Sequence, residues 1–264
     1  MEIANSVVDE FIARRDKGEL TAREEDSYLN QALIRQGEQD QDGLTFDDVK
    51  STCAGLLSAG IDTTSGMMTW FVLHAAMNRD IQQRLRKELQ ATLVDGKLTP
   101  DSISASTTPY LFAFTRESHR VTSSVATHVF RTIPENFEVH GHAFPNGTVI
   151  CFDGYSKGVD PAMVEDPLAF NPDRWLPKSV QARKGTPSEV IDHPLFSSSF
   201  SQGARRCPGS RVARNEGHIM LAQLVLDWEM TAPSVKHWKD IPCGQATLTV
   251  PMPMPRIEMK PLFK

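Results

Sequence analysis

One cysteine of this 264-residue chain stands in a setting that suits a thiolate metal ligand. Cys207 directly follows Arg205 and Arg206, and Gly203 and Gly209 lie on either side of it. A cysteine binds a metal as the thiolate, and neighbouring cations lower the pKa of a thiol. Glycines adopt turns that residues with a Cβ avoid, so both glycines would let backbone amides approach the sulfur. The competing interpretation is a structural cysteine buried beside a basic loop.

The residues after Cys207 are predicted to form the helix that positions it. Pro208 suits the first helical position, where no backbone N–H is needed. Apolar residues then recur with helical spacing, which predicts an amphipathic helix from about Ser210 to Trp228. The predicted apolar face comprises Val212, Met220, Leu221, Leu224, Val225 and Trp228.

This cysteine-containing run resembles the haem-binding loop of the cytochrome P450 family, Phe-x-x-Gly-x-Arg-x-Cys-x-Gly. The defining residue types stand at the family's spacing, as Phe200, Gly203, Arg205, Cys207 and Gly209. The resemblance implies that these residues bind haem b (iron protoporphyrin IX). It also implies that the thiolate of Cys207 is the axial ligand of the iron.

A second pattern pairs an acid with a base on a predicted helix that begins near Pro109. Glu117 and Arg120 are three residues apart, and the helix around them is otherwise apolar, which favours burial. An isolated pair of this kind is usually a solvated surface bridge. The pair matches the family's Glu-x-x-Arg, and residues 170–175 resemble its Pro-Glu-Arg-Phe region. The resemblance implies that Arg174 completes a buried structural triad, because buried charges persist only when they are paired.

A third pattern lies within a long, weakly polar stretch from Val49 to Asn78, which predicts one long helix buried in a large domain. A membrane span is the alternative, and Asp62 opposes it. A kinked core helix with back-bonded hydroxyls would also explain the polar residues. Residues 59–64 resemble the family's oxygen-binding motif, Ala/Gly-Gly-x-Asp/Glu-Thr-Thr. The resemblance implies that Gly60 makes room for dioxygen, that Thr63 hydrogen-bonds it and that Asp62 relays protons.

The region after the Glu-x-x-Arg helix contributes further candidate haem contacts. Residues 131–141 resemble a strand pair of the family at this place in the chain. The resemblance implies that Arg131 and Arg205 bind the haem propionates, a task that suits guanidinium groups. His128 is a further candidate, although an ordinary strand histidine explains it equally well.

The pattern of elements predicts a mainly α fold with small β-sheets. Strands are expected at residues 127–132, 137–140 and 148–152, followed by an irregular, proline-rich segment. The order resembles the C-terminal half of the cytochrome P450 fold: long central helix, Glu-x-x-Arg helix, meander, cysteine loop and following helix. We therefore expect residues 1–264 to form a single partial domain whose N-terminal half is missing.

The amino-acid composition argues against several classes of function. The chain has 40% hydrophobic and 23% charged residues, which is typical of a soluble globular protein. A net charge of −5 argues against general nucleic-acid binding. The four cysteines form no Cys-x-x-Cys pair, which argues against zinc or iron–sulfur sites and favours a reducing, intracellular compartment. We expect no membrane span, although the parent enzyme is potentially associated with the mitochondrial or endoplasmic reticulum membrane.

The resemblance implies that the parent enzyme is a haem-thiolate monooxygenase. It would insert one atom of dioxygen into an apolar small-molecule substrate, with two electrons from a ferredoxin or an NADPH-dependent reductase. Basic side chains near the cysteine suit an acidic electron donor; they are Arg205, Arg206, Arg211 and Arg214. Two alternatives stay open. One is a haem-thiolate isomerase or dehydratase, and the other is a truncated, non-catalytic remnant that binds haem weakly or not at all.

Overall fold

Two compact units, residues 1–62 and 63–264, make up the chain. The computed structural model describes residues 2–37, 45–122, 129–196, 199–245 and 248–262. The first unit contains three helices and the beginning of a fourth: α1 (Glu2–Asp16), α2 (Ala22–Glu25), α3 (Tyr28–Gly37) and the first part of α4 (Phe46–Met77). Thr21 begins α2 with a capping box, in which the N–H of Glu24 donates to Thr21 Oγ1 and the Glu24 carboxylate accepts from the N–H of Thr21.

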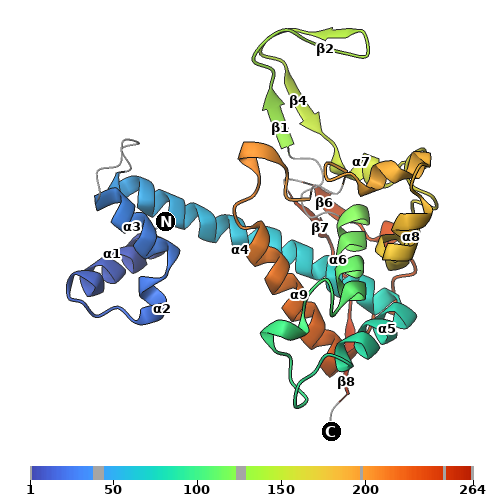
Figure 1. Cartoon of the computed structure of the whole chain (residues 1–264), viewed down its shortest axis with the longest axis horizontal. Coiled ribbons are helices and arrows are strands. Elements are labelled where there is room, and N and C mark those ends of the chain that lie inside the picture. The colour runs from blue at the N-terminus through green and yellow to red at the C-terminus, as the bar shows by residue number, and fades with distance from the viewer. Residues whose placement is uncertain (1, 38–44, 123–128, 197–198, 246–247, 263–264) are drawn as a thin grey trace. The chain divides into compact units, whose positions relative to one another are not determined.

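The second unit is built around a group of packed helices. These are the last part of α4, α5 (Arg79–Gln90), α6 (Pro109–Val121) and α9 (Ser210–Asp227). Figure 1 shows α5, α6 and α9 close together, and α9 packs against both of the others. Two shorter helices, α7 (Gly154–Gly158) and α8 (Pro177–Ala182), belong to the irregular segment between the strands and the cysteine loop.

Apolar side chains from α4, α5, α6 and α9 form the main core of the second unit. Its fully buried members include Phe71, Leu85, Leu111 and Leu221. The contact between α4 and α9 is close because of Gly217. A Cβ at that position would lie only 2.8 Å from Met67 Cε and 3.0 Å from Phe71 Cε2.

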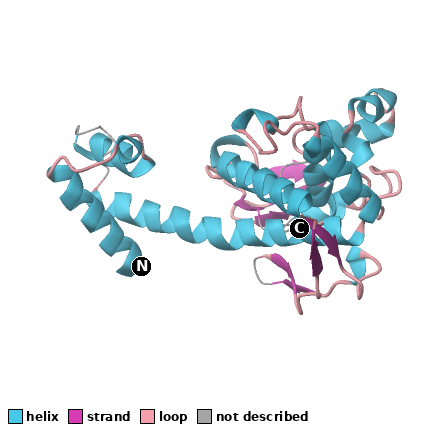
Figure 2. Ribbon diagram, turned by 90° about the horizontal axis from the view of Figure 1, so that it is seen from below, coloured by secondary structure: helices cyan, strands magenta, loops and turns pink. Residues whose placement is uncertain are grey.

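The strands of the described residues form four two-stranded antiparallel sheets, and Figure 2 shows how small they are beside the helices. The pairs are β1 (Val129–Thr132) with β4 (Val149–Phe152), β2 (Phe137–Val139) with β3 (His142–Phe144), β5 (Trp228–Thr231) with β8 (Glu258–Pro261), and β6 (Cys243–Gln245) with β7 (Thr249–Pro251). Register aligns Arg131 with Ile150 in the first sheet and Met230 with Met259 in the third. Strand β3 was not predicted from the sequence.

Two polar side chains of α5, the half-buried Glu88 and the buried Gln82, join this helix to its neighbours. The Glu88 carboxylate accepts the N–H groups of Tyr110 (2.8 Å) and Leu111 (2.9 Å), which lack partners within α6. Burial raises the pKa of Glu88, and these two hydrogen bonds lower it. The Gln82 amide donates to the carbonyls of Ala75 and Met230, each at 2.9 Å, and accepts the Met230 N–H at 3.0 Å.

The mainly helical fold with small sheets agrees with the prediction, and helix α9 ends one residue before the predicted limit. Two expectations about burial were wrong. The long helix is buried from Gly66 to Ala76, with partly buried positions among them, but Leu57 and Ile61 are 60% and 59% exposed. Val212, predicted to lie on the apolar face of α9, is 59% exposed. No described helix has the length and apolar character that crossing a membrane requires.

Candidate functional site

The cysteine loop is a tight backbone turn that ends where α9 begins. The N–H of Cys207 donates to the carbonyl oxygen of Phe200 at 2.9 Å, and the N–H of Arg206 donates to that of Gly203 at 3.0 Å. Gly203 has a φ of +76°, a conformation in which a Cβ is strained. Ser201 also has a positive φ, +59°. The loop therefore presents the side chain of Cys207 at the surface, where it is exposed.

The backbone conformation expected at Gly209, a turn closed to residues with a Cβ, was wrong. Its φ of −79° is open to any residue, and a Cβ there would lie 3.9 Å from Cys207 Sγ, an ordinary contact. Gly209 instead begins α9, and its carbonyl accepts the N–H of Ala213 at 2.9 Å. Gly203 is thus the glycine of this loop whose backbone conformation disfavours a residue with a Cβ.

Basic side chains surround the loop. Arg205, Arg206 and Arg211 are exposed, and none of them forms an ion pair with another described residue. The guanidinium of Arg214 lies over the ring of Phe200, 4.6 Å from its centroid. Burial lowers the pKa of Arg214 and so does the charge of Arg206, whereas Cys207 raises it. The surface around the sulfur is therefore positively charged.

Two of the other predicted haem contacts lie on or near the first sheet. Arg131 lies in β1, is exposed, and donates from Nη1 to the Phe130 carbonyl at 2.7 Å. His128 lies outside the described residues. Among the described residues, no hydrogen bond or ion pair joins Arg131 or Arg205 to Cys207.

The predicted oxygen-binding motif lies in the middle of α4. The division between the two units falls between Asp62 and Thr63, so Gly60 and Asp62 belong to the first unit and Thr63 to the second. Gly60 and Asp62 are exposed and Thr63 is half-buried. A Cβ at Gly60 would meet no atom within 4 Å. The helix α4 continues through the motif without interruption.

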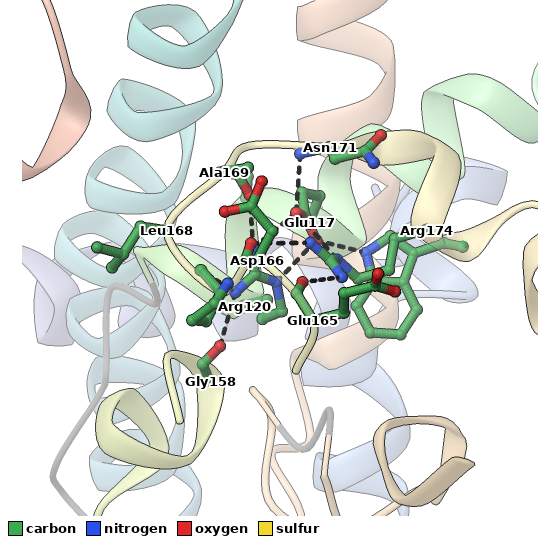
Figure 3. A network of polar contacts seen from close by, with 12 residues as sticks. Glu117, Arg120, Gly158, Glu165, Asp166, Leu168, Ala169, Asn171 and Arg174 are labelled. Atoms are coloured by element: carbon green, nitrogen blue, oxygen red, sulfur yellow. Dashed lines mark hydrogen bonds and ion pairs between the residues drawn. The ribbon is translucent and has the colours of Figure 1, made fainter. Parts of the chain in front are cut away.

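The structure brings Glu117, Arg120 and Arg174 together in a buried polar network (Figure 3). Glu117 is 0% exposed. Its carboxylate accepts from Arg120 Nε at 2.9 Å and from Arg120 Nη2 at 2.7 Å, a bidentate geometry. Arg174 Nε lies 3.5 Å from the same carboxylate.

Further donors and acceptors of this network come from the end of α7, from the short 3-10 helix Pro172–Trp175 and from the irregular segment between them. Arg120 donates to the carbonyls of Gly158 (2.6 Å), Pro167 (2.7 Å) and Ala169 (2.9 Å). The Trp175 indole N–H donates to Glu117 at 2.8 Å. The Asn171 N–H also donates to Glu117, at 2.9 Å. One helical ion pair thus holds the segment that precedes the cysteine loop.

Sequence reasoning missed the contacts that surround Phe200. The imidazole of His119 meets the Phe200 ring edge-on, with centroids 5.6 Å apart, and it meets Phe71 in the same way at 5.4 Å. Burial, then the charges of Arg214 and His218, lower the pKa of His119 to about 4. The only sequence signal was a single histidine in an apolar helix, a pattern that does not name its partner.

Comparison with known proteins decides the family. The sequence model of the cytochrome P450 family matches residues 1–260. The chain belongs to the cytochrome P450 family. Within the part that the structure describes, no group of three or more His, Cys, Asp or Glu side chains could hold a metal ion. A P450 binds its iron through one protein ligand, so this finding does not conflict with the assignment.

The P450 relatives include mitochondrial enzymes. Sterol 26-hydroxylase of Rattus norvegicus is 32% identical over 71% of this chain and 34% of its own length. The Homo sapiens enzyme is 34% identical over 70% of this chain and 34% of its own length. (S)-N-methylcanadine 1-hydroxylase of Papaver somniferum is 30% identical over 85% of this chain and 40% of its own length. The chain thus spans between a third and two fifths of the length of these relatives.

A solved P450 structure shares the fold. Cyanobacterial CYP120A1 with bound retinoic acid matches with a TM-score of 0.80 and 22% identity, over 98% of this chain and 55% of that chain. The likeness covers both units. At this level of identity it concerns the fold alone.

Proposed function

We propose that this chain is the haem-binding part of a haem-thiolate monooxygenase, and that residues 1–264 form one partial P450 domain. The observation that carries the proposal is the cysteine loop, which presents an exposed thiol just before α9, beside guanidinium groups that form no ion pair with another described residue. The substrate is an apolar small molecule, as the names of the sterol-hydroxylating relatives suggest.

The residues of the loop fit a haem. The Cys207 side chain is exposed, while the N–H of the same residue is bonded to the Phe200 carbonyl, so the loop is fixed and the sulfur is available. Cys207 would hold the iron. The exposed guanidinium groups of Arg131 and Arg205 would hold the propionate carboxylates, with His128 as a further contact. When bound, a haem ligated by a cysteine thiolate would supply the cleavage of dioxygen, which consumes two electrons and two protons.

The motif in α4 would handle oxygen and protons. Gly60 offers open space, because it has no Cβ and none of its neighbours fills the position. The carboxyl oxygen of Asp62 would hold a proton and pass it on, and the Thr63 hydroxyl would donate the next hydrogen bond. An acid followed by a hydroxyl in one turn of a helix is suited to such a relay.

The electron donor would be an acidic protein that docks on the basic surface around the cysteine loop. The exposed guanidinium groups of Arg206 and Arg211, together with Arg214, supply complementary charge. Ferredoxins serve mitochondrial P450s, and the mitochondrial relatives favour this donor over an NADPH-dependent reductase. The same relatives support a mitochondrial parent enzyme.

A haem titration of the purified chain tests the proposal. We expect added haem to give the red-shifted Soret band of a thiolate-bound iron in the reduced carbon monoxide complex. Cys207→Ala should abolish that band, and Cys151→Ala, the matched change at another exposed cysteine, should retain it. Persistence of the band in Cys207→Ala, or its loss in Cys151→Ala alone, would contradict the assignment.

A second candidate is a remnant that holds haem too weakly for catalysis. The exposed apolar residues beside the oxygen motif favour it, since Leu57 and Ile61 are 60% and 59% exposed. Large exposed apolar patches mark surfaces that another protein segment covers. Full haem occupancy in the titration would contradict this candidate, whereas sub-stoichiometric binding with no turnover would support it.

A further inference from the structure

Phe200, the first residue of the cysteine loop, is held between two helices. From α9, the Arg214 guanidinium lies 4.6 Å above the ring centroid. From α6, the His119 imidazole approaches the ring edge-on at 5.6 Å. The carbonyl of the same phenylalanine accepts the N–H of Cys207 at 2.9 Å. The position of the Phe200 ring is therefore coupled to the backbone of the cysteine.

Arg214 also acts on the loop through its charge. It interacts electrostatically with Cys207 and with Arg206, which affect its pKa in opposite directions. Among the described residues, no carboxylate forms an ion pair with Arg214. A cation without a counter-ion, fixed by stacking on an aromatic ring, produces a persistent local potential.

We propose that Arg214 is a positioning residue for Cys207, which fixes the cysteine loop by stacking on Phe200 and creates a positive potential at the sulfur. The link to haem rests on the proposed function, since only there is Cys207 the iron ligand. In that setting, a positive potential beside the iron-binding thiolate would favour the reduced state of the site, which carries the more negative charge. The loop geometry itself does not depend on haem.

The potential is measured on the chain without haem. A single-cysteine parent is made by Ser substitution of Cys53, Cys151 and Cys243, and Cys207 is then alkylated with iodoacetate or with iodoacetamide. One reagent is an anion and the other is neutral, but both react with the thiolate by the same displacement. The ratio of their rates therefore cancels the thiolate fraction and reports the potential at the sulfur.

We expect Arg214→Gln to lower the iodoacetate-to-iodoacetamide ratio by roughly two- to fourfold, which is the order of effect of one unit charge at a partly hydrated surface. Arg214→Lys should rescue the ratio, and added salt should shrink the difference between the variants. Arg211→Gln removes the same charge from the same helix and should lower the ratio by less, because it is Arg214 that stacks on Phe200 beside the cysteine. Equal effects of the changes at Arg214 and Arg211 would overturn the proposal.

Hydrogen exchange tests the stacking. In Arg214→Ala the Cys207 amide should exchange faster, because its acceptor carbonyl belongs to Phe200, while the amides of α5 keep their rates. Unchanged exchange at Cys207, or an equal rise throughout α5, α6 and α9, would assign Arg214 no positioning role. Failure of the chain to bind haem would contradict the proposed function without changing either measurement, so the two failures are distinguishable.

Discussion

We expect the substitution Glu117→Gln to destabilise the second unit strongly, because it leaves the Arg120 guanidinium buried without its counter-charge. Glu117 is 0% exposed and Arg120 is 6% exposed, so water cannot replace the lost carboxylate. The substitution preserves the size of the side chain. The predicted effect is therefore electrostatic and not a result of lost packing.

The magnitude follows from the network. Removal of one partner from a buried ion pair costs about 3–5 kcal/mol. The Trp175 indole N–H and the Asn171 N–H donate to separate oxygens of Glu117, at 2.8 Å and 2.9 Å. A glutamine offers only one acceptor atom, so one of these donors loses its partner. Because domains have a total stability of about 5–15 kcal/mol, the loss is a large fraction of the whole.

Urea unfolding followed by tryptophan fluorescence measures the change, because Trp175 belongs to the network. Glu135→Gln, at an exposed position between β1 and β2, serves as the matched control and should leave the unfolding midpoint unchanged. A loss of less than about 1 kcal/mol in Glu117→Gln, the value of an ordinary hydrogen bond, would refute the argument.

A double variant separates the ion pair from the rest of the network. If the pair acted alone, Glu117→Gln with Arg120→Met would recover most of the stability, as replacing buried pairs by apolar residues often does. We expect no such recovery, because Arg120 also donates to the carbonyls of Gly158, Pro167 and Ala169. Full recovery would show that these carbonyl contacts contribute nothing.

Two other predictions concern a close contact at Gly158 and the protonation of the buried His74. Gly158→Ala should destabilise the chain by about 2 kcal/mol or more in the same urea assay, because the new Cβ would clash with the Arg120 carbonyl oxygen. Gly55→Ala is the control: its Cβ would meet no atom within 4 Å, so the substitution should stabilise its helix slightly. His74 is fully buried, and burial is the largest cause of the lowering of its pKa to about 3. As the pH falls below about 6.5, a proton is therefore taken up by this histidine in the unfolded chain but not in the folded one. The contribution of His74 to the free energy of unfolding should therefore fall with pH from about 6.5 towards 3, by up to about 1.4 kcal/mol per unit. It should be flat above 6.5, and His74→Phe should reduce the slope; an unchanged slope would contradict the assignment.

The sequence predicted the helices and the order of elements because periodicity and turn residues are local signals. It also selected Glu117 and Arg120 as a pair, since an acid and a base one turn apart on an apolar helix need each other. The remaining acceptors of Arg120 could not be predicted. They are backbone carbonyls, which have no sequence signature, in a segment with no regular periodicity.

The burial errors have a different physical origin. Leu57, Ile61 and Val212 are apolar, but apolar residues also contribute much of a protein's exposed surface. Hydrophobicity alone therefore does not reveal whether a neighbouring segment covers a helix face. The expectation for Gly209 was wrong for a similar reason, because the identity of a glycine does not reveal its φ.

The Gln82 amide has a consequence for the third sheet. Strand β5 pairs with β8 on one side, and on the other side the N–H and carbonyl of Met230 bond to the Gln82 side chain. A strand edge without such a partner is a template to which a strand of another molecule can add, and this is a common route to aggregation. With Gln82 only 1% exposed, one buried amide imitates a neighbouring strand and closes that edge. Helix α5 thus protects the β5 edge of the third sheet from strand addition as well as supporting the core.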